Sequence, residues 1–155
     1  MAHIIARLKE DRAAVEEVFG RLRAVNGSAE DRDALYSVLG RFFAALTKFE
    51  ESVFYSAVRE SAAATSQGVD LVIGQAVSEH REILKLLRTI TDLEPSDPEC
   101  ARARNTLEQA VRSHFEREAA EIFPLAARVI SDDVAEEMTL RHDAMARDAM
   151  VRERV

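Results

Sequence analysis

The sequence has few of the residues that interrupt regular secondary structure. Its 155 residues include five glycines and three prolines, and there is no tryptophan. β-Sandwiches and β-barrels need many turns, so this scarcity disfavours those folds and favours long, uninterrupted elements. Hydrophobic residues make up 47% of the chain and charged residues 32%, a balance that argues against disorder. We expect a single domain over residues 1–155, because a chain of this length builds one core.

Three further absences narrow the class of protein. Cys100 is the only cysteine, which excludes a disulfide framework or a thiolate zinc cluster and favours the reducing cytoplasm. The net charge of −7 has no basic stripe to offset it, so we expect no nucleic-acid partner. No apolar run is long enough to cross a membrane, and the opening residues MAHIIARLKEDR lack a secretory core, so we expect no membrane contact.

The apolar residues recur at helical rather than alternating spacing. Near the start of the chain, Ile5, Leu8, Val15 and Leu22 fall on one stripe at intervals of three, seven and seven residues. Long amphipathic helices with short connections pack as antiparallel neighbours. The pattern therefore predicts an all-α, up-down-up-down four-helix bundle with a short additional C-terminal helix. The expected helices cover residues 3–25, 29–64, 69–93, 97–130 and 132–150.

Several residues at the expected helix ends have capping or breaking chemistry. Gly27 is expected to end the first helix and Ser28 to cap the second. Pro98 falls in the first turn of its helix, where proline is tolerated, and Ser131 is expected to cap the last helix. Pro124 is expected to bend the fourth helix near its end.

Five ionisable residues interrupt the apolar stripes. These are Arg12, Glu50, His80, His114 and Glu118, so that each helix of the predicted bundle directs at least one of them inward. Taken singly, each has an ordinary explanation as a hydrogen-bonded or outward-reaching core residue. A buried charge without a partner costs several kcal/mol, however. One or more on every helix therefore favours a shared polar cluster, in which the groups pair with each other or coordinate a metal.

Four stretches of the sequence carry the most informative pattern. They are LKEDRAAVEEVF (Leu8–Phe19), FEESVFYSAVRE (Phe49–Glu60), SEHREILKLL (Ser78–Leu87) and HFEREAAEIFPLA (His114–Ala126). In this order, and over nearly the whole predicted bundle, they resemble the hemerythrin-like, or HHE cation-binding, family. Members of this family are four-helix bundles that normally hold a non-heme diiron centre. They bind oxygen, nitric oxide or similar small ligands, or they sense iron or redox state.

The resemblance implies that part of the family's metal site is kept. The bridging glutamate of the second helix corresponds to Glu50, and the histidines of the third and fourth helices correspond to His80 and His114. Glu118 matches members whose acidic ligand follows that histidine by four residues, whereas a spacing of five would fall on Ala119. The residual metal ligands are therefore Glu50, His80, His114 and Glu118.

The resemblance also implies two losses. The family's histidines on the first and second helices fall on Arg12 and Leu46. A guanidinium stays protonated, cannot be a ligand and repels a nearby cation. We therefore hypothesise a core ion pair between Arg12 and Glu50 that replaces lost metal charge.

These observations predict a non-enzymatic binding or sensory module without oxygen-carrier activity and with no cofactor. The alternative is a protein of redox or small-gas sensing that binds one iron or zinc ion through Glu50, His80, His114 and Glu118. Two metal ions are the least favoured arrangement. A homodimer or an unknown protein partner is also considered, because the aromatic residues on the second helix are expected in the core with one or two left for an interface. His142 is expected to be exposed to solvent.

Overall fold

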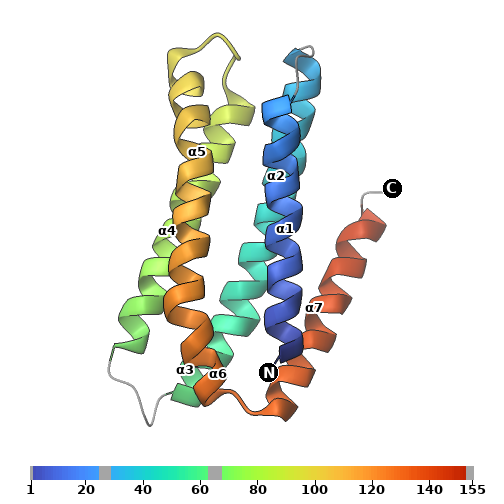
Figure 1. Cartoon of the computed structure of the whole chain (residues 1–155). Helices are drawn as coiled ribbons and strands as arrows, with labels where there is room; N and C mark the ends of the chain where they lie inside the picture. Colours follow the sequence, from blue (N-terminus) through green and yellow to red (C-terminus); the bar gives the residue numbers. More distant parts are fainter. Residues whose placement is uncertain (1, 25–28, 63–67, 153–155) are drawn as a thin grey trace.

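The structure, a computed structural model, describes residues 2–24, 29–62 and 68–152, and within these ranges every regular element is helical (Figure 1). The expected caps at Gly27 and Ser28 lie outside the described residues. The α-helices are α1 (Ala2–Ala24), α2 (Ala29–Phe49), α3 (Tyr55–Ala62), α4 (Val69–Asp92), α5 (Pro98–Arg117), α6 (Phe123–Val129) and α7 (Asp132–Arg152).

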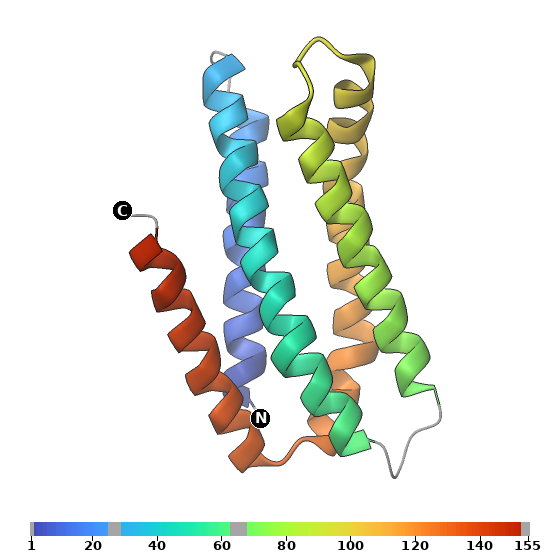
Figure 2. The ribbon, with the colours of Figure 1, turned by 180° about the vertical axis from the view of Figure 1, so that it is seen from behind.

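Four antiparallel rods form the bundle, and α7 lies outside it. The rods are α1, α2 continued by α3, α4, and α5 continued by α6. Their directions alternate along the chain, and both views show α7 beside α1 and α2 (Figures 1 and 2). The predicted up-down-up-down bundle is therefore confirmed. The additional C-terminal helix has 21 residues and is shorter than each of the four rods.

Two of the rods contain a π-helical turn, which the sequence pattern did not predict. The turns cover Glu50–Phe54, between α2 and α3, and Glu118–Ile122, between α5 and α6. In the first, the N–H of Tyr55 donates to the carbonyl of Glu50, a span of five residues instead of four. Such turns insert one extra residue into a helix and occur frequently at functional sites. Both of these turns begin at one of the predicted interior glutamates.

The helix ends largely follow the predicted chemistry. Asp97 accepts a hydrogen bond from the Glu99 backbone N–H at 2.8 Å, with Pro98 in the first turn of α5. Ser131 Oγ accepts from the backbone N–H of Val134 at 3.4 Å, as expected for the cap of α7. Gly68 precedes α4 with φ of 95°, a conformation that side chains other than that of glycine rarely adopt. Pro124 lies in the first turn of α6, directly after the π-helical turn.

The core is built from the apolar stripes of all the helices. Its fully enclosed members include Leu8, Leu39, Phe43, Ile73 and Leu107. Most of the aromatic residues on the second rod are buried as expected, but Phe42 is 45% exposed. Within the described ranges, none of the helices has the length and apolar character needed to cross a membrane.

Helix α7 attaches to α1 and α2 through a polar seam. His142 Nε2 lies 2.7 Å from Asp11 Oδ2, and its Nδ1 lies 3.3 Å from Asp143 Oδ1. Arg7 Nε donates to Asp143 Oδ1 at 3.0 Å. The His142 ring also packs edge-on against Phe49, with 5.0 Å between the centroids. The expectation that His142 is exposed is therefore wrong, because the ring is only 9% exposed between these partners.

Candidate metal centre

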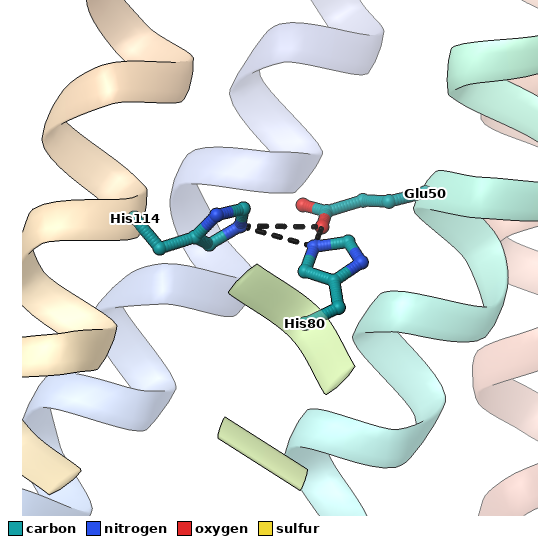
Figure 3. A group of neighbouring side chains, drawn as sticks. All are labelled: Glu50, His80 and His114. Atoms are coloured by element: carbon teal, nitrogen blue, oxygen red, sulfur yellow. Dashed lines mark hydrogen bonds and ion pairs between the residues drawn. The ribbon is translucent and has the colours of Figure 1, made fainter. Parts of the chain in front are cut away.

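Three of the predicted site residues converge in the middle of the bundle. Glu50 comes from the π-helical turn after α2, His80 from α4 and His114 from α5 (Figure 3). All three are buried, and one ligand atom from each lies within 4.8 Å of the others. Glu50 Oε2 lies 3.0 Å from His80 Nε2 and 4.0 Å from His114 Nε2. The two Nε2 atoms lie 3.0 Å apart.

The far side of each imidazole contacts a carboxylate. His80 Nδ1 lies 2.8 Å from Glu51 Oε1, and His114 Nδ1 lies 2.9 Å from Glu79 Oε2. An ionised carboxylate only accepts hydrogen bonds, so Nδ1 is the nitrogen that carries the proton of each neutral ring. The other nitrogen, Nε2, then directs an unshared pair of electrons into the bundle, the arrangement typical of histidine ligands to metals.

The cluster formed by Glu50, His80 and His114 contains several hydrogen-bond acceptors but too few hydrogen-bond donors to pair with them. Glu50 is completely buried, and neither of its carboxylate oxygens has a hydrogen-bond partner of good geometry among the described residues. Two imidazole nitrogens face it at the distances given above. A buried carboxylate without compensation costs several kcal/mol, so this arrangement favours the uptake of a cation.

Protonation of the two histidines can supply only part of the positive charge that would compensate Glu50. Burial opposes the charged form of His80, but its contacts with Glu50 and Glu51 outweigh that effect, so the pKa of His80 is raised. Burial, together with repulsion from His80, lowers the pKa of His114 to about 3. Near neutral pH the two neutral histidines therefore take up no more than one additional proton between them. His114 stays neutral and can donate its Nε2 electron pair to a metal.

Arg12 pairs with Glu118, not with Glu50 as hypothesised. Arg12 Nη2 donates to Glu118 Oε2, and Nη1 donates to the Phe115 carbonyl at 3.2 Å. The guanidinium packs over the rings of Phe115 and Phe123, with its carbon 4.8 and 4.3 Å from their centroids. Both rings belong to the rod that carries Glu118, and their attraction for a cation holds Arg12 against that rod. This is the physical reason for the correction.

Glu118 lies beside the three-residue cluster. Its Oε2 is 3.9 Å from His114 Nε2, and its Oε1 accepts a hydrogen bond from the Tyr55 hydroxyl at 3.1 Å. Burial and repulsion from Glu50 raise the pKa of Glu118 to about 8, against the opposing effect of Arg12. The two carboxylate oxygens of Glu118 already have protein partners, Arg12 and Tyr55. The role of Glu118 as a metal ligand remains a prediction.

The π-helical turns explain how Tyr55 reaches this network. Residues five apart in an α-helix face nearly opposite sides, about 140° apart. The wider turn between Glu50 and Tyr55 brings both side chains inward, and Tyr55 OH lies 3.5 Å from His80 Nε2. From the sequence, Tyr55 is expected in the core, but its contact with His80 is not predicted. The roles of Glu51 and Glu79 are not predicted either, although each lies next to a predicted ligand in the sequence.

Comparison with known proteins agrees with the helical architecture. The family model of the hemerythrin HHE cation binding domain matches residues 3–126, which include all residues of the cluster and end before α7. The chain is also similar to the crystal structure of a hemerythrin HHE cation binding domain-containing protein from Mycobacterium kansasii. The TM-score is 0.72 and the sequence identity 22%, over 96% of this chain and 90% of that chain. At that identity the likeness establishes the fold. No protein of curated function matches the sequence.

Proposed function

Because the chain belongs to the hemerythrin HHE cation-binding domain family, we propose that it binds a single iron or zinc ion through Glu50, His80 and His114. The protein would then be a non-enzymatic binding or sensory module without oxygen-carrier activity. One observation carries this proposal. Three buried acceptors converge, and the protein supplies Glu50 with no hydrogen-bond donor of good geometry among the described residues.

The donor set suits either metal. Two imidazoles and one carboxylate occur both in catalytic zinc sites and in mononuclear non-heme iron sites. Three protein donors leave coordination positions open, so the bound ion would supply a place for a small ligand. The residues themselves would contribute a rigid frame, because the three donors come from three different rods of the bundle.

The charge of Arg12 supports one ion over two. A second metal near Glu118 would meet a permanently charged guanidinium that already contacts the carboxylate. The family resemblance attributes oxygen binding to a pair of irons, and the residues that would hold the second iron are the ones in which this chain differs. Arg12 therefore acts, in this proposal, as a fixed cation in place of that iron.

Elemental analysis of protein produced in medium supplemented with iron and zinc tests the proposal. We expect about one equivalent of metal per chain in the wild type, and loss of that metal in His80→Ala and in His114→Ala. His3→Ala, which removes an exposed histidine, is the matched control and should retain the metal. Two equivalents in the wild type would contradict the single-ion proposal, and background levels would contradict metal binding altogether.

A metal-free module is the second candidate, and one observation favours it. His80 Nε2 lies 3.0 Å from Glu50 Oε2, so a proton on His80 would give Glu50 a counter-charge without any metal. If so, addition of Zn²⁺ or Fe²⁺ would leave the thermal midpoint of unfolding unchanged, whereas binding to the folded state would raise it.

A further inference from the structure

The two carboxylates behind the histidines follow a regular scheme around the bundle. Glu51 adjoins the ligand Glu50 on one rod and contacts His80 on the next. Glu79 adjoins His80 on α4 and contacts His114 on α5. Two consecutive rods thus each supply a donor to the centre and, from the neighbouring position in the sequence, a hydrogen-bond acceptor that fixes the donor of the following rod.

These two carboxylates are not electrostatically equivalent. Glu79 Oε1 also contacts Arg117 Nε at 3.1 Å, so a fixed positive charge offsets its negative charge. For Glu51, the only ion-pair partner within the described ranges is His80 itself. The side chains are 39% exposed for Glu51 and 20% exposed for Glu79, so both lie at the edge of the bundle with one oxygen directed inward.

We propose that Glu51 and Glu79 are positioning residues for the cation site, and that Arg117 makes them unequal. The two carboxylates hold the Nδ1 protons and thereby present both Nε2 atoms to the centre. Since Arg117 offsets the charge of Glu79, the uncompensated charge of Glu51 contributes more to cation affinity. This inference rests on the proposed metal binding by Glu50, His80 and His114.

The affinity for Zn²⁺, measured by competition with a chromophoric chelator, tests the ranking. Loss of such a partner weakens metal binding by roughly 10–100-fold. We expect Glu51→Ala to fall near the upper end of that range and Glu79→Ala near the lower end. Glu51→Gln should lie between Glu51→Ala and the wild type, because the amide oxygen still accepts from Nδ1 although the charge is lost. Arg117→Gln should bind Zn²⁺ more tightly than the wild type, because it frees the charge of Glu79.

Nuclear magnetic resonance of the zinc-loaded protein provides a second measurement that a general loss of stability would not reproduce. Among the imidazole N–H protons of the wild type, that of His80 and that of His114 should each be protected from exchange. Glu51→Ala should lose the protection of the His80 proton alone, and Glu79→Ala that of the His114 proton alone. Glu82→Gln, which neutralises an exposed carboxylate on α4, is the matched control and should change neither the affinity nor the two signals.

The outcomes distinguish a failure of the positioning role of Glu51 and Glu79 from a failure of the proposed metal binding. If the wild type binds no Zn²⁺, the metal-binding proposal fails first. If the wild type binds Zn²⁺ and both alanine variants keep its affinity and both protected protons, the positioning inference is wrong. If Glu79→Ala weakens binding as much as Glu51→Ala does, the role given to Arg117 is wrong.

Discussion

The interior cluster and the α1–α7 seam both place histidine against carboxylates, but the nitrogens are used differently. In the seam, both ring nitrogens of His142 face a carboxylate, that of Asp11 or Asp143. Only the protonated ring donates from both nitrogens, so a proton completes this site. In the interior, His80 also faces a carboxylate with each nitrogen, Glu51 at Nδ1 and Glu50 at Nε2. His114 differs, because its Nδ1 faces Glu79 and its Nε2 lies nearest to His80 Nε2.

This difference shows that burial and the neighbouring groups together decide whether a histidine ring is protonated. The hydrogen bond to Asp11 outweighs partial burial and raises the pKa of His142. His114, enclosed beside His80, has its pKa lowered. The seam therefore favours the charged form of its histidine, whereas the interior keeps at least one neutral ring available as a metal ligand.

The largest expected effect comes from removing the interior fixed cation. Arg12→Ala leaves the buried carboxylate of Glu118 without its counter-charge, and breaking a buried pair in this way costs about 3–5 kcal/mol of unfolding free energy. Urea denaturation at pH 9, above the pKa of Glu118 of about 8, measures the loss, which should be smaller at pH 6, where Glu118 is protonated. Arg23→Ala is the matched control on the same helix, because Arg23 pairs with Glu108 at the surface, where such pairs contribute at most about 1 kcal/mol.

Arg12→His replaces the guanidinium by a group that can coordinate metal. We expect this variant to bind more metal per chain than the wild type does. If Arg12→Ala were as stable as the wild type, the ion pair between Arg12 and Glu118 would not stabilise the fold. Unchanged metal content in Arg12→His would show that charge alone does not exclude a second ion.

A smaller effect, dependent on pH, is expected in the seam. A raised pKa in the folded state means that protonated His142 stabilises the fold fully below its unfolded pKa of about 6.5. That contribution is lost as the pH rises through the higher folded value. His142→Gln should therefore reduce the unfolding free energy by about 1–3 kcal/mol at pH 6, as expected for hydrogen bonds to a charged group.

The difference between wild type and His142→Gln isolates this effect from the titration of His80 and His114. It should shrink steadily as the pH is raised from 6 to 9 in a series of urea denaturation curves. A difference that stays constant with pH would mean that His142 contributes by packing against Phe49 and not by its charge.

The smallest effect is expected from the seam's other cation. The Arg7 side chain is 41% exposed and shares Asp143 with His142. Arg7→Gln should therefore cost less than about 1 kcal/mol of unfolding free energy, measured by the same urea denaturation. A loss as large as that in His142→Gln would show that the arginine, and not the imidazolium, is the main attachment of α7.

Much of the fold could be predicted from sequence because the apolar spacing of each rod is long and regular. Leu8 and Val15 lie in the core as their spacing indicates. The inward positions of Glu50, His80 and His114 followed from the same periodicity. The π-helical turns could not be predicted, because one extra residue barely changes the spacing on either side of it.

The side chains that each polar residue contacts could not be predicted from the sequence either. Arg12 lies on the interior stripe, but whether it contacts Glu50 or Glu118 depends on where two phenylalanine rings of another rod hold it. Glu51 and Glu79 look like ordinary surface residues, because their importance comes only from the imidazole on the adjacent rod. His142 belongs to a helix whose docking site is formed by residues more than 90 positions away.

The two wide turns also set how this bundle tolerates changes in chain length. Removing one residue between Glu51 and Phe54 would let that rod return to regular α-helical winding, with Tyr55 four positions after Glu50 and still on the inward face. The side chain of Tyr55 would then keep its direction toward Glu118, and the helix itself would stay intact. A single-codon deletion here would thus shorten the rod by one residue without changing which of its side chains face the polar interior.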